Sequence, residues 1–423
     1  MNASSQSAPG VLGDWWGEAE CWRRQEAQEP WNGVHANNRA NALWLHDDPW
    51  AALEPAQRAV DLLPDHPRVW CTLGNVLQDL GRLQEASSAY QRSLHLHSDA
   101  ATAFNCSKVL MGLGRFEQAY RLAEQRLEKP GFQADRPGPR WRGWPEVRQL
   151  WLWGEQGFGD VLQHLRWLVP LLQQGIAVRL ELEPALVPLV EEGLAWAGGQ
   201  LQVQPTQQTP SSLPPDSCHG SLLSLPLLLG GAPLAGVAPY LRLPAIGKQL
   251  VGPASAGRLP RIGVVWASGA FLDGHVLERD YRRKSLQGRP LQSLLNALAM
   301  RPLELVALQF GPDRQAPPWI GGFAAELPAA ADFREAAAWL QQLDLLISVD
   351  TAAAHLAGAM GLPVWMLLPW AAEARWQLER STTPWYPSMR LLRQPGHGDW
   401  YGLIQLLLAH LDVWLSNWPK RRS

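Results

Sequence analysis

A short stretch that could bind a ligand lies between an apolar run and a leucine-patterned segment. Residues 155–160 read Glu-Gln-Gly-Phe-Gly-Asp; they follow the apolar run Gln149–Trp153 and precede leucines at helical spacing. This pattern predicts a strand, a loop and a helix, and such loops are where open α/β sheets bind ligands. The same residues also suit a tight turn at Gly157 and Gly159 followed by a helix that Asp160 caps. Both interpretations stay open.

The glycines of this stretch exclude two common nucleotide motifs. Gly154, Gly157 and Gly159 do not give the spacing GxGxxG, and no Gly-Lys-Ser or Gly-Lys-Thr follows them. The dinucleotide fingerprint and the P-loop both depend on those spacings. The sequence therefore disfavours an NAD-dependent enzyme and an ATPase.

A second stretch, residues 348–359, joins the end of a predicted strand to a helix that opens with small residues. The unpaired backbone N–H groups of Thr351, Ala352 and Ala353 could approach an anion there, and phosphate is the natural ligand. An ordinary capped helix packed on a sheet is the alternative. His355, one turn into the helix, is more often a core histidine than a catalyst.

A third stretch, residues 279–285, is basic: it reads Arg-Asp-Tyr-Arg-Arg-Lys-Ser. Arg283 and Lys284 could neutralise a diphosphate, although a solvated loop explains the charge equally well. Two aromatic segments, Arg375–Trp376 and 384–387, could offer rings that stack on a base or a sugar.

Around these stretches the sequence predicts two α/β halves. The first follows the order β-α-β-α-β, and the second repeats the alternation. Continuous apolar strands such as Leu345–Ile347 indicate parallel strands that are covered on both faces. Two such domains in tandem leave one cleft between them. The expected strands are 149–153, 176–182, 201–203, 262–266, 303–308, 343–348 and 364–368, and the expected helices include 184–197, 291–300, 332–342, 351–360 and 401–415.

The N-terminal third of the chain is repetitive. Ala52, Ala86 and Ala119 are separated by 34 and 33 residues, and the pattern Gly-Arg-x-x-x-Ala recurs at 81–86 and 114–119. A fixed period of this length predicts a repeated helix-turn-helix unit.

Small and aromatic residues complete the repeat pattern. Gly74 and Ala86 would let paired helices approach closely, while Trp70 and Tyr90 would fill the space between repeats. Over about residues 33–130 the chain thus resembles the tetratricopeptide repeat. Three repeats are about the minimum that buries a continuous core, so we expect this array to lean on the chain that follows it.

Composition narrows the class of protein. The chain has 423 residues, of which 46% are hydrophobic and 18% charged, and its net charge is -2. These values predict a folded, multidomain protein and disfavour nucleic acid as a partner. The four cysteines, Cys21, Cys71, Cys106 and Cys218, form no CxxC pair, which disfavours zinc and disulfide frameworks and fits a cytosolic compartment. Prolines interrupt the apolar window 222–243, which argues against a membrane span.

The chemistry-bearing stretches together resemble one family. From Gln149 to Trp400 the chain is similar to tetratricopeptide-linked proteins whose catalytic part is similar to glycosyltransferase family nine, the bacterial ADP-heptose:lipopolysaccharide heptosyltransferases. The markers are residues 155–163, 263–267, 283–285, 350–359 and 385–387. The resemblance implies the GT-B fold, in which two Rossmann-like domains face a cleft, the C-terminal one holds a nucleotide-sugar, and a final helix crosses back.

The resemblance also implies roles for single residues. Gly159 and Asp160 match the family's Gly-Asp pair, whose aspartate is the proposed catalytic base. The segment from Asp350 and Thr351 to His355 matches its nucleotide-diphosphate motif. Two segments depart from the residues that are usual in this family: Ala-Ser-Gly at 267–269 and Glu-Ala-Arg-Trp at 373–376. Both departures affect which sugar donor is expected.

These observations predict a metal-independent glycosyltransferase. Asp160 and Gly159 form its expected catalytic pair. The N–H groups of residues 351–353, with Arg283 or Lys284, would stabilise the departing diphosphate, and the chain has no DxD carboxylate pair. No metal or other cofactor is expected. The alternative is a non-catalytic repeat protein in which the GT-B part is a degenerate scaffold.

The sequence also predicts the domain boundaries and the partners. An N-terminal tail (1–32) and repeats (33–130) precede a linker (131–146), Rossmann-like domains at 147–250 and 258–400, and a helix at 401–418. The expected partners are a nucleotide-sugar donor, a glycan or protein acceptor, and a protein bound by the repeats. The class is α + α/β: a tetratricopeptide solenoid followed by a GT-B fold.

Overall fold

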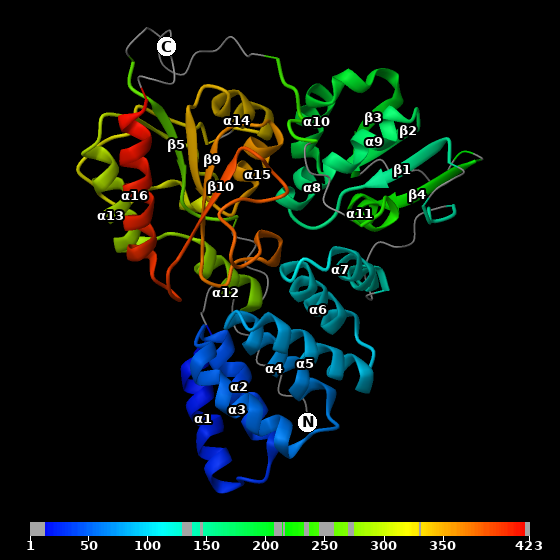
Figure 1. Cartoon of the computed structure of the whole chain (residues 1–423), viewed down its shortest axis with the longest axis vertical. Coiled ribbons are helices and arrows are strands. Elements are labelled where there is room, and N and C mark those ends of the chain that lie inside the picture. The colour runs from blue at the N-terminus through cyan, green and yellow to red at the C-terminus, as the bar shows by residue number, and fades with distance from the viewer. Residues whose placement is uncertain are drawn as a thin grey trace. The chain divides into compact units, whose positions relative to one another are not determined.

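The computed structural model describes residues 13–128, 138–143, 147–206, 214, 216–231, 237–244, 258–269, 275–329 and 331–418 (Figure 1). The described residues form two compact units. The first contains residues 13–128, 275–282 and 373–378, and the second contains the remainder. Each unit is described by itself below.

The first unit is built from helices that pack in sequence. Each helix contacts the next one, and α2 also contacts α4, as α4 contacts α6. Within the described chain this gives three helical pairs over residues 33–123, which confirms the helix-turn-helix repeats. The helices are α1 (Trp15–Gln28), α2 (Gly33–Leu45), α3 (Pro49–Leu62), α4 (Pro67–Asp79), α5 (Leu83–Leu96), α6 (Ala100–Gly112) and α7 (Phe116–Ala123), with the 3₁₀ turn η1 (Glu124–Glu128).

The Gly-Arg-x-x-x-Ala pattern has a simple structural cause. Gly81 and Gly114 both have a φ of +75° at the turn inside their helical pair, a backbone conformation that favours glycine. Ala86 and Ala119 then lie fully buried on the following helix. The repeat pattern therefore marks the tight turn and a buried contact on the helix that follows it.

Gly74 shows how closely the helices of one pair approach. A Cβ atom added to Gly74 would lie 2.7 Å from the ring of Tyr90, and Tyr90 is fully buried. The Tyr90 hydroxyl donates a hydrogen bond to Asn75 Oδ1 at 2.6 Å. The close approach expected at Gly74 is confirmed, and the Tyr90 ring packs within its own helical pair.

We expect Gly74→Ala to lower the free energy of unfolding by about 1–3 kcal/mol, because its methyl group overpacks the Tyr90 ring. Thermal unfolding followed by circular dichroism measures the change. Gly322→Ala is the matched control, since a Cβ at Gly322 meets no atom within 4 Å. A rise in melting temperature for Gly74→Ala would show that helix propensity outweighs packing at this position.

The prediction of an N-terminal tail over residues 1–32 is wrong for residues 15–28, which form α1. Asp14 caps this helix by accepting a hydrogen bond from the Gly17 N–H at 2.8 Å, and α1 packs on α2. Its buried residues are only Ala19 and Glu26. Its packed side carries Trp15, Ala19 and Trp22 at helical spacing, a short stripe that the charged residues among them obscure in the sequence.

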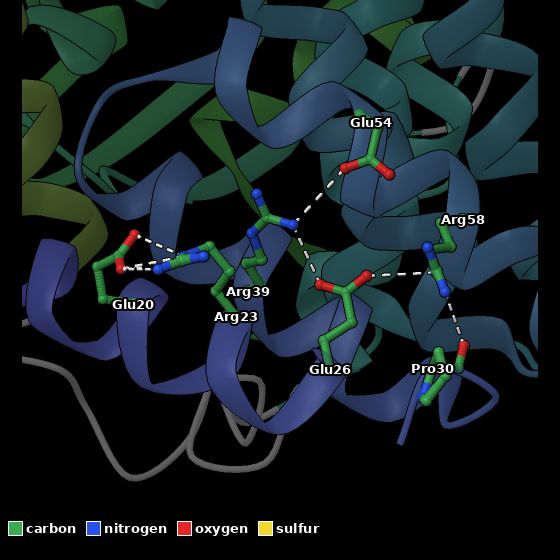
Figure 2. Close-up of polar contacts among 7 residues, drawn as sticks. All are labelled: Glu20, Arg23, Glu26, Pro30, Arg39, Glu54 and Arg58. Carbon is green, nitrogen blue, oxygen red and sulfur yellow. Dashed lines mark hydrogen bonds and ion pairs between the residues drawn. The ribbon is translucent and has the colours of Figure 1, made fainter. Parts of the chain in front are cut away.

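Charge holds α1 in place (Figure 2). The buried Glu26 carboxylate pairs with Arg39 of α2 at 3.1 Å and with Arg58 of α3 at 3.3 Å, and Arg39 also pairs with Glu54 at 3.6 Å. A buried carboxylate needs such compensation. These ion pairs tie three helices together, beside the packing of Ala19 and Trp15 in the core of the repeats.

The second unit contains two parallel sheets, and the first has the strand order β3-β2-β1-β4. The expected strands at 149–153, 176–182 and 201–203 are confirmed, while β4, with the sequence Ser-Cys-His-Gly-Ser, was not predicted because it has no apolar run. The strands are β1 (Gln149–Trp153), β2 (Ala177–Leu182), β3 (Leu201–Pro205) and β4 (Ser217–Ser221). The α-helices of this part are α8 (Phe158–His164), α9 (Leu168–Gln173), α10 (Val187–Gly193) and α11 (Leu225–Leu228).

Part of the predicted linker 131–146 belongs to this sheet. Arg140 forms a parallel bridge to His219, and the Trp141 N–H donates to the His219 carbonyl at 2.8 Å. The large ring of Trp141 is buried, which explains why these residues are ordered along β4. The rest of the predicted linker, 131–137 and 144–146, lies outside the described residues.

The second sheet is also wholly parallel, with the order β10-β9-β8-β5-β6-β7. In chain order this is the arrangement 3-2-1-4-5-6 of a Rossmann fold. Every residue of β5, β8 and β9 is buried, as their continuous apolar runs predict. The strands are β5 (Arg261–Val265), β6 (Glu304–Ala307), β7 (Ala325–Glu326), β8 (Leu345–Val349), β9 (Val364–Leu368) and β10 (Met389–Arg393).

Helices cover this second sheet. They are α13 (Gly288–Ala299), α14 (Phe333–Leu340), α15 (Ala352–Ala359) and α16 (Trp400–Ser416). The final helix α16 packs on α13 and β10, and Arg301 pairs with Asp412 at 2.6 Å. These partners belong to the C-terminal α/β domain. The family resemblance implies instead a final helix that crosses back to the N-terminal α/β domain.

The expected fold class is confirmed. Helical repeats are followed by two Rossmann-like α/β domains, the α + α/β architecture of a tetratricopeptide solenoid and a GT-B fold. The apolar window 222–243 contains only the 3₁₀ turn η6 (Leu222–Ser224) and α11 among its described elements. In the part of the chain that the structure describes, no helix is long and apolar enough to cross a membrane.

Candidate nucleotide and catalytic site

The strand order places two loops at the point where a Rossmann sheet binds nucleotides. In the C-terminal sheet the order reverses between the neighbours β5 and β8, and ligands of open α/β sheets bind outside the carboxyl ends of the strands at such a reversal. The segment that follows β5 begins at Trp266, and the segment that follows β8 begins at Asp350. The predicted diphosphate motif therefore lies at the expected edge of the sheet.

Thr351 caps α15 at this edge. Its Oγ1 accepts a hydrogen bond from the Ala354 N–H at 3.4 Å and lies 3.0 Å from Ser348 Oγ. Ala352 and Ala353 follow with side chains too small to shield the backbone. The first N–H groups of a helix have no partner within the helix, so this end of α15 can receive an anion.

His355 is held between two polar groups. Its ring is buried, with Nδ1 2.9 Å from the Tyr386 hydroxyl and Nε2 3.5 Å from Asp350 Oδ1. A carboxylate accepts hydrogen bonds, so the proton of the neutral ring belongs on Nε2, and Nδ1 accepts from Tyr386. His355 thereby orients Asp350 at the start of the diphosphate motif.

The basic stretch approaches the same edge through its last residues. The Ser268 N–H donates to Ser285 Oγ at 3.1 Å, and the Leu286 N–H donates to the Trp266 carbonyl at 2.7 Å. Lys284, the last residue of α12 (His275–Lys284), directly precedes these contacts. One residue earlier, Arg283 Nη2 donates to the Ala371 carbonyl at 3.3 Å.

A buried glutamine fixes the loop after β5, and the sequence reasoning missed it. Gln309 Oε1 accepts from the N–H groups of Trp266 and Ala267 at 3.0 and 2.9 Å, and its Nε2 donates to the Ala267 carbonyl at 3.0 Å. The available signal was a single polar residue directly after the expected strand 303–308.

In the N-terminal sheet the strand order reverses between β1 and β4, and α8 follows β1. The carboxylate of Glu155, beyond the end of β1, accepts a hydrogen bond from Ser221 at the end of β4. Asp160 lies in the first turn of α8, where its Oδ2 accepts from the Gly157 N–H at 3.2 Å. The capping contact that the sequence left open is present, at the third helical position rather than at the N-cap.

The two sheets bring their helices together at Gly159. A Cβ atom at Gly159 would lie 2.8 Å from His355 Cδ2, and α8 contacts α15. Only glycine allows this approach without displacement of the histidine ring. The structure thus places the expected catalytic pair Gly159–Asp160 beside the diphosphate motif, although the two lie about 200 residues apart in sequence.

Arg166, which follows α8, links this helix to the segment that contains Trp385 and Tyr386. It is fully buried, and its guanidinium lies 5.7, 5.4, 5.4 and 4.8 Å from the ring centres of Trp167, Tyr240, Trp385 and Tyr386. Its Nη1 donates to the Trp385 carbonyl at 2.6 Å. Cation–π contacts of this kind are strongest when they are desolvated.

The suggestion that the aromatic segments stack on a ligand is wrong for three rings. Trp376, Trp385 and Tyr386 are 1%, 1% and 0% exposed, so their faces are already covered by protein. Trp385 and Tyr386 instead enclose Arg166. Arg279, the first residue of the basic stretch, is likewise buried and pairs with Asp79.

Comparison with known proteins gives distant similarities. No family model matches the chain. Protein FlbA of Caulobacter vibrioides is 24% identical over 437 aligned positions, which cover 86% of this chain and 70% of FlbA.

Among solved structures, the iron-containing dodecameric glycosyltransferase TibC from enterotoxigenic E. coli shares 14% identity over 66% of this chain and 77% of TibC, with a TM-score of 0.44. E. coli heptosyltransferase WaaC with ADP shares 14% over 64% of this chain and 99% of WaaC, with a TM-score of 0.37. MamA shares 22% over 28% of this chain and 71% of MamA, with a TM-score of 0.27.

We expect Tyr386→Phe to remove the hydrogen bond to His355 Nδ1. The phenylalanine ring should still pack against the Arg166 guanidinium. The loss of the buried hydrogen bonds of the Tyr386 hydroxyl, to His355 and to the Tyr240 side chain, should lower the free energy of unfolding by about 1–3 kcal/mol. The ¹⁵N shifts of the His355 ring report the change directly, because Nδ1 loses its donor. Ring shifts that match the wild-type protein would contradict the hydrogen bond to Tyr386.

Proposed function

We propose that the chain is a glycosyltransferase that moves a sugar from a nucleotide-sugar to a glycan, lipid-linked or protein acceptor. One observation carries the proposal. The helices α8 and α15, each at the strand-order reversal of its own sheet, meet at Gly159 and His355. A carboxylate that could take a proton and an anion-binding helix end are therefore close together.

The donor diphosphate would bind at the start of α15. The N–H groups of residues 351–353 supply fixed donors, and Arg283 and Lys284 supply positive charge near the loop after β5. Such preorganised groups stabilise the negative charge that develops on a departing diphosphate. The proposal needs no metal ion or other cofactor for this step.

The acceptor side of the reaction is assigned to Asp160. The acceptor oxygen attacks the anomeric carbon, the bond from that carbon to the diphosphate oxygen breaks, and the hydroxyl proton passes to the Asp160 carboxylate. The nucleoside diphosphate leaves with the electron pair of the broken bond. The hydrogen bond from Gly157 orients the carboxylate, whose oxygens can accept more than one proton donor.

The second candidate is a non-catalytic repeat protein with a degenerate GT-B part. The capping contact of Asp160 and the burial of His355 favour it, because both residues then have structural duties. In either case we propose a protein partner for the repeats and a cytoplasmic location. Turnover of nucleotide-sugars discriminates between the two candidates.

The donor site predicts the outcome of calorimetry with UDP, GDP and ADP. At least one of these nucleotides should bind the wild-type protein, and Ala352→Glu should abolish that binding because its carboxylate occupies the phosphate position. Asp332→Asn, at the N-cap of α14, is a control that should bind as the wild type does. Equal affinities for Ala352→Glu and wild type would move the phosphate site elsewhere.

We expect Asp160→Asn to bind nucleotide normally but to transfer sugar roughly 10²- to 10⁴-fold more slowly, the usual contribution of a positioned general base. Asparagine can still accept the Gly157 hydrogen bond, so the melting temperature should hardly change. Initial rates with a panel of nucleotide-sugars measure the effect. Near-normal turnover would assign Asp160 to capping alone.

A further inference from the structure

The contact between α8 and α15 leaves no space for a side chain at Gly159. A Cβ atom there would lie 2.8 Å from His355 Cδ2 and 3.4 Å from His355 Nε2. Carbon atoms attract one another best at about 3.5–4.0 Å, so a separation of 2.8 Å is strongly repulsive. Both helices belong to one compact unit. A larger residue at this position must therefore displace either α8 or the imidazole ring.

The position of α8 relative to α15 is fixed by buried hydrogen bonds. The Tyr240 hydroxyl donates to the Leu162 carbonyl of α8 at 2.8 Å. The Tyr240 N–H donates to the carbonyl of Ala359, the last residue of α15, at 3.0 Å. Arg166 adds its bond to the Trp385 carbonyl at 2.6 Å. Because a buried polar group that loses its partner is destabilising, the imidazole ring moves more easily than α8.

The imidazole of His355 is held at both nitrogens, but not equally. Nδ1 lies 2.9 Å from the hydroxyl of Tyr386, a fully buried residue whose ring would lie 2.6 Å from a Cβ atom at Gly358 of α15. Nε2 lies 3.5 Å from Asp350 Oδ1, a longer and therefore weaker contact. A methyl group on residue 159 would press on the Cδ2–Nε2 edge of the ring. The contact to Asp350 is therefore the one that is lost first.

Asp350 directly precedes the backbone N–H groups that would bind the diphosphate, those of residues 351–353. Its side chain is 7% exposed. An ionised carboxylate repels a diphosphate, and the repulsion is strong where water is excluded. The contact with His355 holds this carboxylate to one side. Without that contact, the carboxylate can itself accept hydrogen bonds from N–H groups at the helix start, as aspartate commonly does.

We propose that Gly159 is a positioning residue for the donor site: because it has no side chain, His355 can hold the Asp350 carboxylate away from the diphosphate. Tyr386 supports the same ring from its other nitrogen. This inference rests on the proposed function. It separates the roles of Gly159 and Asp160, which the sequence grouped as one catalytic pair: Gly159 acts on donor binding, and Asp160 acts on the acceptor.

Gly159→Ala in the full-length protein tests the proposal. We expect about tenfold weaker binding of the preferred nucleotide among UDP, GDP and ADP by calorimetry, whereas Asp160→Asn should bind that nucleotide normally. With the corresponding nucleotide-sugar, the donor KM of Gly159→Ala should rise. The ¹⁵N shift of His355 Nε2 should also change, because its contact with Asp350 is lost.

Gly220→Ala is the matched control. Gly220 is a buried glycine of β4 in the same α/β domain as Gly159, but a Cβ atom there would lie 3.6 Å from Leu152 Cδ2, an ordinary contact. The variant should bind nucleotide as the wild type does. Equal weakening by Gly220→Ala and Gly159→Ala would overturn the proposal, because a general effect of filling a buried glycine would then explain both.

A double-mutant cycle tests the part assigned to Asp350. Asparagine at position 350 has no charge that could repel a diphosphate. In the Asp350→Asn protein, the further change Gly159→Ala should therefore weaken nucleotide binding less than twofold, against about tenfold in the wild-type background. An equal loss in both backgrounds would overturn the proposal, since Gly159 would then act without the Asp350 carboxylate.

The remaining outcomes are also decisive. A folded Gly159→Ala protein with wild-type affinity overturns the positioning role while the proposed function stands. A wild-type protein that binds none of the three nucleotides overturns the proposed function itself. If Gly159→Ala does not fold, Tyr386→Phe decides: it removes the hydrogen bond to His355 Nδ1 and keeps the buried ring, and unchanged nucleotide affinity would reject the proposal.

Discussion

The α/β unit depends on one buried cation. Arg166 follows α8 in the chain and lies among the rings of Trp167, Tyr240, Trp385 and Tyr386. Burial raises the pKa of the Tyr240 phenol, so its hydroxyl stays protonated and donates to the Leu162 carbonyl of α8 at 2.8 Å. A desolvated guanidinium cannot shift without losing these contacts. The helix that carries Asp160 is therefore fixed to the segment that carries the histidine's partner.

Arg279 solves the same physical problem in another way. Arg166 is compensated by ring faces and by the carbonyls of Gln163 and Trp385. Arg279 instead has the carboxylates of Asp79 and Asp280, the Trp44 carbonyl and one ring at 3.8 Å. Each arginine joins segments that are far apart in sequence. Arginine suits both places because its flat guanidinium stacks on aromatic faces while its edges donate hydrogen bonds.

The sequence alone predicted the elements whose residue pattern is local. Continuous apolar runs predicted β5, β8 and β9, and the turn glycine Gly81 with its following alanine predicted the helical repeats. Helix α1 was not predicted because its apolar stripe is short, and long-range ion pairs to Arg39 and Arg58 supplement it. The segments of the candidate site were also found, but not their partners. The bond from Arg166 to Trp385 spans 219 residues, and nothing local announces such a pairing.

The discontinuous make-up of the repeat unit has a consequence for synthesis. The repeat helices leave the ribosome first, yet Arg279 is translated 200 residues after Asp79. At about 5–20 residues per second, this interval lasts roughly 10–40 s. During that time the nascent repeats display the Trp44 ring and a carboxylate without their eventual counter-charge, and Leu378 arrives later still. The repeat unit can therefore complete its buried charge pair only after this interval.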